Sequence, residues 1–157
     1  MQTEIIQLHS LQEICAALTR FAPTLPSLSG GPSVRQTFAE KFYKYGVVLA
    51  LRDVDEITAF AAFYCNDLQK RCGYLSMLAV MPEARGCGNG KKLLAHVCRS
   101  CREAGMSRLK LEVSNANEPA MRLYKSMGFV MSAECTDHSV YMEKELQDCE
   151  QYGRVVQ

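Results

Sequence analysis

The sequence has almost no net charge and no long apolar run. Its 18 lysines and arginines balance 17 aspartates and glutamates to a net charge of +1, which argues against nucleic-acid binding as its main task. No apolar stretch approaches the roughly 18 residues that a membrane helix needs. Residues 1–8 also lack the basic start and the apolar length of a secretory signal. We therefore expect a cytoplasmic protein whose partners include neither a nucleic acid nor a membrane.

The sequence also lacks the ligand spacing of a metal site, although it contains eight cysteines. Cys98 and Cys101 form a CxxC pair, but no second CxxC or HxxxH pair completes a zinc site. Without a secretory signal, free thiols are favoured over disulfides. Both residues, like Cys15 and Cys65, lie within apolar patterns, where cysteine packs as a small hydrophobic residue. We expect core packing and no metal, with a metal or redox role of the CxxC pair as the alternative.

The composition, with 48% apolar and 22% charged residues, is typical of one globular domain spanning residues 1–157. Apolar periodicity predicts strands at residues 4–8, 47–51, 57–65, 72–80, 109–113, 129–131 and 139–144. It predicts helices at 11–18, 34–44, 93–104 and 119–127, the first of them with a capping box formed by Ser10 and Glu13. It also predicts a long loop at 22–34 and a loose tail at 147–157. Short turns favour an antiparallel meander of the middle strands, and the strand–helix–strand order over residues 72–113 implies a parallel pair. The expected fold class is α/β (α+β), with a mixed, mostly antiparallel central sheet of about six or seven strands and about four helices.

The most informative stretch is residues 78–94, where an apolar strand pattern runs through a glycine-rich basic turn into an amphipathic helix pattern. Gly86, Gly88 and Gly90 let backbone N–H groups approach a ligand closely, and a helix start adds unpaired N–H donors and a positive dipole end. This arrangement suits a pyrophosphate. The glycine spacing is not the GxGxxG of a dinucleotide loop. Arg85 and Lys92 stand where a nucleotide P-loop has Gly and Ser or Thr. Both nucleotide interpretations therefore fail.

Two motifs together resemble the GNAT superfamily of N-acetyltransferases. Residues 85–90, Arg-Gly-Cys-Gly-Asn-Gly, match that family's acetyl-CoA loop, in which Gln or Arg is followed by two residues, Gly, one residue, and Gly or Ala. Residues 117–129, ending in Leu-Tyr-Lys-Ser-Met-Gly-Phe, resemble its second segment, N-x-x-A-x-x-L-Y-x-x-x-G-F. The resemblance covers residues 47–145. It implies a single-domain GNAT fold with a splayed parallel pair of strands, and acetyl-CoA as the co-substrate of an acyltransferase.

The resemblance assigns site residues by their positions in these segments. The strand before the loop would pair with the pantetheine arm through its backbone, and one of its N–H groups would face the thioester carbonyl. The loop would hold the pyrophosphate, Asn117 would bond the pantetheine arm, and Tyr124 would donate a hydrogen bond to the departing thiolate. The implied cofactor-binding residues are Leu78, Ala79, Val80, Arg85, Gly86, Cys87, Gly88, Asn89, Gly90, Lys91, Asn117 and Tyr124, and Tyr124 is also the implied catalytic residue.

Each assignment has a structural alternative. The strand residues could simply pack in the core, and the loop could be a solvated glycine-rich turn. Asn117 could act only as a helix N-cap, since Asn is favoured there, and Tyr124 could be a core residue on its helix face.

The general base is left open by the sequence. An attacking amine arrives mostly protonated and must lose a proton. Glu83, Glu112 and a water chain through Tyr74 or Ser76 are the alternatives. Glu112 could instead form a surface ion pair with Lys110, since the two face the same side of one strand.

The resemblance implies that acetyl passes to a primary amine by direct attack in a ternary complex. We expect the amine to lie between the loop at 22–34, the helix that carries Phe38 and Phe42, and the hairpin at 130–139. A small-molecule amine is the first expectation, and a protein N-terminus or lysine the second. A non-catalytic acyl-CoA-binding regulatory module is the alternative function, and a homodimer is compatible with the sequence.

Overall fold

The computed structural model describes residues 3–146, so the predicted tail at 147–157 lies outside the described residues. The elements in chain order are β1 (Thr3–Gln7), α1 (Leu11–Phe21), the short 3-10 turns η1 (Ala22–Thr24) and η2 (Pro26–Leu28), α2 (Pro32–Tyr45), β2 (Val47–Asp53), β3 (Glu56–Tyr64), β4 (Cys72–Val80), the 3-10 turn η3 (Pro82–Ala84), α3 (Asn89–Glu103), β5 (Arg108–Ser114), α4 (Glu118–Ser126), β6 (Val130–Cys135) and β7 (Ser139–Glu145). Each predicted strand and helix is present, with boundaries shifted by a few residues. Within the described range, no helix has the length and apolar character needed to cross a membrane.

The strands form one mixed seven-stranded sheet in the order β1-β2-β3-β4-β5-β7-β6. β1 to β4 pair antiparallel in sequence order, and β7 lies antiparallel between β5 and β6. β4 and β5 are parallel and are joined by the crossover helix α3. The predicted meander and parallel pair are therefore confirmed.

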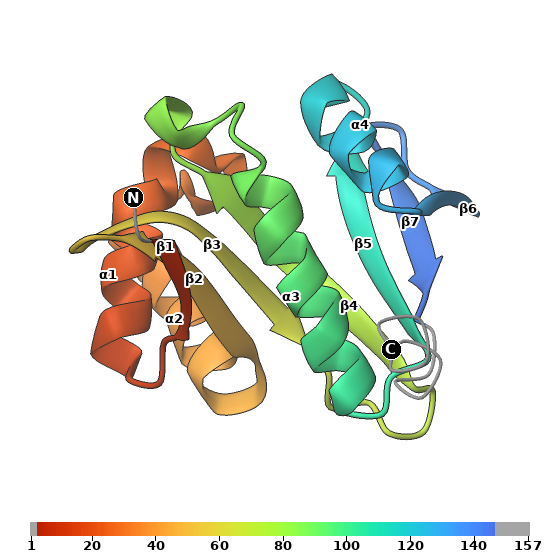
Figure 1. Cartoon of the computed structure of the whole chain (residues 1–157), viewed down its shortest axis with the longest axis horizontal. Coiled ribbons are helices and arrows are strands. Elements are labelled where there is room, and N and C mark those ends of the chain that lie inside the picture. Colours follow the sequence, from red (N-terminus) through yellow and green to blue (C-terminus); the bar gives the residue numbers. More distant parts are fainter. Residues whose placement is uncertain (1–2, 147–157) are drawn as a thin grey trace.

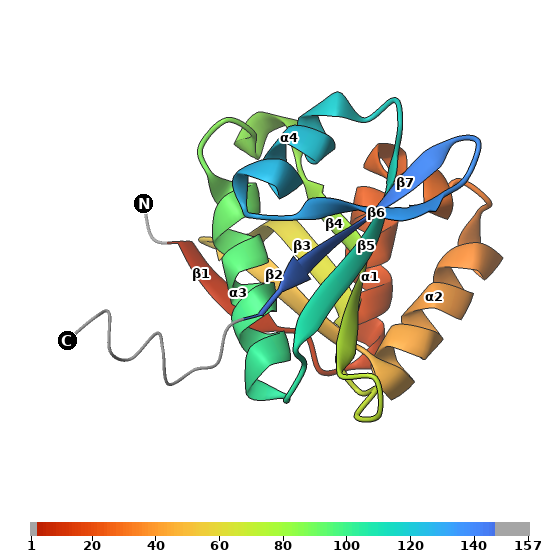
Figure 2. The ribbon, with the colours of Figure 1, turned by 90° about the vertical axis from the view of Figure 1, so that its right-hand side faces the viewer.

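Two hydrophobic cores cover opposite faces of the sheet. α1 and α2 pack on one face, and α3 and α4 pack on the other (Figure 2). In the first core the rings of Phe21 and Phe60 lie 5.0 Å apart, and full burial of such a side chain stabilises a fold by about 1.5–3 kcal/mol. This core draws its strand residues from β1 to β4. On the same face, β5 and β7 instead carry polar side chains, such as Lys110, Glu112 and Glu143.

Local sequence signals fix how the chain enters its helices. The Ser10 Oγ accepts a hydrogen bond from the Glu13 N–H at 3.0 Å, and the Glu13 carboxylate accepts one from the Ser10 N–H at 3.3 Å, so the predicted capping box of α1 is confirmed. Two short 3-10 turns lie within the predicted long loop at 22–34, and α2 begins before its predicted end. Prolines in the first positions of η1, η2 and α2 set these turns and start α2 at Pro32, because the fixed φ of proline suits a helix start.

The parallel pair is short, and its two strands then separate. β4 pairs with β5 only over Cys72–Leu75. Directly afterwards β4 carries one extra residue, Ser76, relative to its other neighbour β3. Such a bulge bends its strand and increases the local twist. β4 and β5 therefore diverge toward their carboxyl ends (Figure 1), and the splay implied by the family resemblance is present.

The bulge also changes which side chains face which core. Leu75 lies in the α3–α4 core, whereas Met77, two residues later, lies in the α1–α2 core. In a regular strand residues two apart share a face, so the inversion locates the bulge at Ser76. Beyond it, the Leu78 side chain packs toward α3 and that of Ala79 toward the α1–α2 core.

Candidate active site

The glycine-rich turn leads into the N-terminus of α3 next to this divergence. Gly86 and Gly88 have φ values of +82° and +80°, a left-handed conformation that glycine adopts readily. Gly88 is the N-cap residue of α3. A Cβ at either glycine would meet no atom within 4 Å, so both border open space. With the N–H groups of the first helical turn and the positive end of the helix dipole, the turn fits an anionic group such as a pyrophosphate.

Two side-chain hydrogen bonds stabilise this turn. Asn89 Nδ2 donates to the Ala84 carbonyl at 2.9 Å, and Arg85 Nε donates to the Val80 carbonyl at 3.0 Å. The Cys87 and Lys91 side chains are exposed. Arg85 is therefore held by its Nε at the end of β4, with its positive charge beside the opening.

Gly90 has a packing role. A Cβ there would lie 3.2 Å from Leu123 Cδ2 and 3.8 Å from Val80 Cγ2. The absent side chain lets the first turn of α3 approach α4 across the carboxyl end of β4. Leu123, the neighbour of Tyr124 in the chain, therefore lies beside the helix start that follows the loop.

The backbone of β4 beyond the bulge lies along the opening. The Met81 N–H donates to the Thr58 carbonyl at 2.8 Å, and in an antiparallel pair alternate residues direct their backbone groups to the same side. Ala79 therefore directs its N–H and carbonyl toward β3. Leu78 and Val80 direct theirs toward the side on which β5 has moved away. Their N–H groups point to where an extended ligand would lie between the strands.

Tyr124 lies on the inner face of α4. Its side chain is only 8% exposed, and its ring packs edge-on against Phe129 with the centroids 5.7 Å apart. Burial raises the pKa of Tyr124 to about 12. The hydroxyl is therefore protonated throughout the neutral range and can act as a hydrogen-bond donor.

Asn117 caps α4, as its structural alternative predicted. Its Oδ1 accepts a hydrogen bond from the Ala120 N–H at 3.2 Å. The residue is exposed, and the cap uses only the oxygen of the amide. The cap is therefore compatible with a ligand contact through Nδ2.

A carboxylate lies where β4 and β5 part. Glu112 is the residue after the last β5 position that pairs with β4, and its cross-strand partner on β7 is Tyr141. The Tyr141 hydroxyl donates to Glu112, and this hydrogen bond raises the pKa of Tyr141. The pKa of Tyr74 is raised as well, first by burial and next by the negative charge of Glu112. Glu112 thus lies on the face opposite α3 and α4, where its charge favours the protonated form of both tyrosines.

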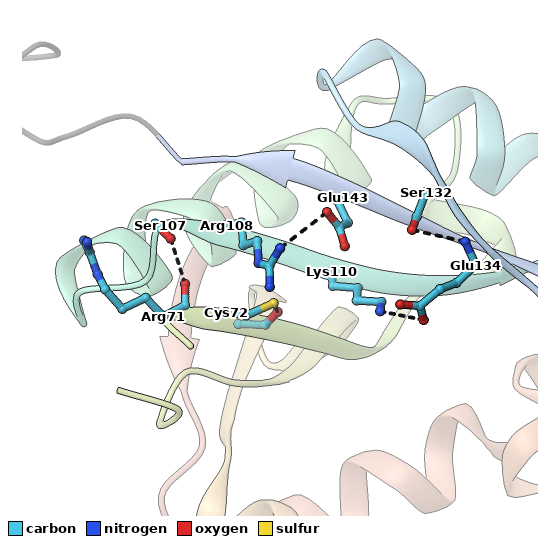
Figure 3. A network of polar contacts seen from close by, with 9 residues as sticks. Arg71, Cys72, Ser107, Arg108, Lys110, Ser132, Glu134 and Glu143 are labelled. Atoms are coloured by element: carbon cyan, nitrogen blue, oxygen red, sulfur yellow. Dashed lines mark hydrogen bonds and ion pairs between the residues drawn. The ribbon is translucent and has the colours of Figure 1, made fainter. Parts of the chain in front are cut away.

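The expected alternative of an ion pair between Glu112 and Lys110 is wrong. Lys110 Nζ instead bonds Glu134 Oε2 at 2.9 Å, and Figure 3 shows Lys110 reaching toward β6. The Lys110 ammonium also lies 4.8 Å from the centroid of the Tyr141 ring. The lysine has a separate partner, so Glu112 keeps its tyrosine contacts.

A pocket of about 560 Å³ lies along the connection between α1 and α2. Its lining includes Thr19, Leu25, Ser29 and Arg35. Leu25 packs on the same core as Met81, the residue that follows β4. Part of the segment predicted at 22–34 to border the acceptor site therefore borders a pocket large enough for a small ligand.

The cysteine predictions are confirmed in part. Cys98 and Cys101 are buried in the core beneath α3, as expected, whereas Cys15 and Cys65 are only half-buried. Among the described residues, no three His, Cys, Asp or Glu side chains are grouped so that they could hold a metal ion.

A mixed sheet that opens at a parallel strand pair beside a glycine-rich helix start is the α/β fold of GNAT acetyltransferases. A model of the Acetyltransferase (GNAT) family matches residues 12–129. The chain belongs to this family. The match covers both segments that suggested it.

Relatives of this chain carry different names. It is 36% identical over 97 residues to a streptothricin acetyltransferase from Streptomyces lavendulae, which is 55% of this chain and 51% of that protein. The chain thus spans about half the length of that relative. The structure of the ribosomal-protein-S18-alanine N-acetyltransferase from Escherichia coli superimposes with a TM-score of 0.76 at 22% identity, covering 93% of this chain and 95% of the other. A Salmonella typhimurium structure with its cofactor acetyl-CoA gives 0.73 at 18% identity, covering 94% and 96%.

Proposed function

We propose that this chain is an acetyl-CoA-dependent N-acetyltransferase that passes acetyl to the primary amine of a small molecule by direct attack in a ternary complex. The observation that carries the proposal is the divergence of β4 and β5 between an anion-binding loop on one side and Glu112 on the other. The pocket beside the α1–α2 connection supports a small acceptor. So does the name of the Streptomyces relative, because it denotes a small-molecule acceptor. A cytoplasmic location stays a prediction.

In this proposal the chain holds the co-substrate mainly through its backbone. The turn from Arg85 to Lys91 and the first turn of α3 bind the pyrophosphate, which the dipole of α3 stabilises. The N–H groups of Leu78 and Val80 pair with the pantetheine arm, and one of them donates to the thioester oxygen as negative charge develops there.

In this proposal one side chain accepts a proton and another donates a hydrogen bond. Glu112 accepts the proton of the attacking amine, either directly or through one water, and the Tyr141 hydroxyl fixes its carboxylate. Tyr124 donates a hydrogen bond to the thiolate that leaves. Full proton transfer is unfavourable, because a thiol has a pKa of about 8.5 and that of Tyr124 is about 12.

Release of free CoA in the presence of a panel of amines tests the proposed function. Polyamines, aminoglycoside-type amines, amino acids and peptides with free N-termini are offered separately at saturating acetyl-CoA. Turnover with a small amine is the expected result. Turnover confined to peptides would move the acceptor to proteins, and acetyl-CoA binding without turnover on any amine would favour the regulatory module.

Replacing Tyr124 by Phe is expected to lower kcat about 10- to 150-fold, with little change in acetyl-CoA affinity. A hydrogen bond to a charged group contributes about 1.5–3 kcal/mol, and the thiolate is charged only as the reaction proceeds. Steady-state kinetics and cofactor titration measure the two effects. Tyr45→Phe, at an exposed position at the end of α2, is the matched control. A Tyr124 variant with the same kcat as this control would reduce Tyr124 to a packing residue.

Substitutions of Asn117 separate its cap from its ligand contact. Asn117→Ser keeps a good N-cap and loses the amide, so we expect unchanged thermal stability and a KM for acetyl-CoA raised about 2- to 12-fold, the size of one hydrogen bond. Asn117→Ala should show the same KM and lose a further ~1 kcal/mol of stability. An unchanged KM in the Ser variant would leave Asn117 with the cap alone.

A further inference from the structure

Four thiols gather at the end of the molecule where β4 and β5 remain paired. Cys65 follows β3, Cys72 begins β4, and Cys98 and Cys101 lie in the second half of α3. Each of the other three contributes to the electrostatic environment of Cys101. The group therefore lies toward the end of α3 away from its glycine-rich start, and the proposed reaction uses none of its members.

Within this group the thiol that contacts Cys101 is Cys65. It is not Cys98, with which Cys101 forms the CxxC motif. The Cys101 and Cys65 side chains are hydrogen-bonded to each other. Gly73 provides the room for this contact. A Cβ at Gly73 would lie 3.1 Å from Cys101 Sγ and 3.2 Å from the Tyr64 carbonyl. The Cys101 sulfur thus lies over a glycine of β4, beside the residue that precedes Cys65.

The two thiols differ in access and in acidity. Cys65 is half-buried, whereas Cys101 is fully buried. A hydrogen bond from the Cys101 thiol favours the thiolate of Cys65 and lowers its pKa, and the same contact together with burial raises the pKa of Cys101. The thiolate is the nucleophile in disulfide exchange. Cys65 therefore combines solvent access with a second thiol in direct contact, the pairing of an attacking and a resolving cysteine.

We propose that Cys65 is a thiol-modification site that reacts with low-molecular-weight disulfides and that Cys101 resolves the product. The Cys65 thiolate attacks one sulfur of the small disulfide, which forms a mixed disulfide and releases one small thiolate. The Cys101 thiol then loses its proton and attacks Cys65 Sγ, which forms the Cys65–Cys101 bond and releases the second small thiol. In total one small disulfide is reduced to two thiols and the protein loses two hydrogens.

The product would tie the end of β3 to α3. Because the cluster lies away from the glycine-rich turn, the bond should raise the thermal midpoint and leave acetyl-CoA affinity unchanged. The modification does not depend on the proposed transferase activity, so either can fail without the other.

Incubation of the reduced protein with oxidised glutathione tests the proposal. Intact mass should show loss of two hydrogens, and mapping of a non-reduced digest should identify Cys65 joined to Cys101. Cys101→Ala should stop at the glutathione adduct on Cys65, and Cys65→Ser should give neither product. Cys87→Ser removes an exposed thiol of the glycine-rich turn and should leave the Cys65–Cys101 product unchanged.

A bond mapped to Cys98–Cys101 or to Cys65–Cys72 would overturn the proposal. A second measurement needs no variant. Alkylation of the folded wild-type protein by limiting iodoacetamide should modify Cys65 faster than Cys135, which is exposed but lies on β6, outside the thiol group. Equal or slower modification of Cys65 would also overturn it.

Discussion

Replacing Glu112 by Gln is expected to lower kcat about 10²–10⁴-fold, the contribution of a general base. Gln keeps the size of the side chain and can still accept the hydrogen bond from Tyr141, but it cannot take a proton from the amine. Glu112 is exposed, so its replacement leaves no buried charge without a partner. The fold should therefore be unaffected. The affinity for acetyl-CoA should also hold, because the proposed contacts of the co-substrate lie on the loop, β4 and α4. Steady-state kinetics with saturating co-substrate measures the loss.

The pH dependence separates a base from a merely structural residue. In Glu112→Gln, activity should recover partly as the pH rises, because a growing fraction of the acceptor amine arrives without its proton. Glu83→Gln is the matched control, since Glu83 is the other carboxylate that the sequence offers and lies exposed on η3. We expect near wild-type kcat for it. A large loss in Glu83→Gln with none in Glu112→Gln would exchange the two roles, and near wild-type kcat in both would favour the water chain through Tyr74 or Ser76.

Local signals in the sequence predicted the parts of the fold that depend on neighbouring residues. The capping box at Ser10 and the cap at Asn117 each use hydrogen bonds over three positions. The right-handed crossover through α3 follows from strand–helix–strand order. The turn at 86–90 was recognisable because a left-handed backbone, as at Gly86 and Gly88, favours glycine.

Features that depend on distant segments were not predictable in the same way. The extra residue at Ser76 is defined only by the pairing of β4 with β3, and the sequence 72–80 alone predicts one continuous strand. An ion pair of Lys110 with Glu112, two residues away, was one of the alternatives, but the partner of Lys110 is Glu134, which β6 supplies. The Cys98–Cys101 spacing similarly concealed the contact of Cys101 with Cys65, since the two are brought together only when α3 packs on the sheet.

The proposed general base illustrates the same limit at the site. From the sequence Glu112 was one alternating polar residue on a strand, equal to Glu83 as a candidate. The structure distinguishes them, because Glu112 follows the last residue of β5 that pairs with β4 and is bonded by Tyr141 from β7. Three strands from different parts of the chain are needed to define that location.

Replacing Gly88 by Trp is expected to abolish measurable acetyl-CoA binding while the protein stays folded. The indole would occupy the open space that Gly88 borders at the start of α3, where the proposal places the pyrophosphate. A non-glycine residue at φ +80° also strains the backbone by about 1–3 kcal/mol. Isothermal titration with acetyl-CoA and thermal denaturation measure the two effects separately.

The strain needs its own control, and the chain supplies one at the other end of the same helix. Gly105 has φ +94°, and a Cβ there would also meet no atom within 4 Å, so Gly105→Trp imposes a similar backbone cost away from the loop. It should lose comparable stability and bind acetyl-CoA normally. Loss of binding in Gly88→Trp alone assigns the loop to the co-substrate. Normal binding in both variants would remove the glycine-rich turn from the site, and with it the argument that the opening between β4 and β5 holds a pantetheine arm.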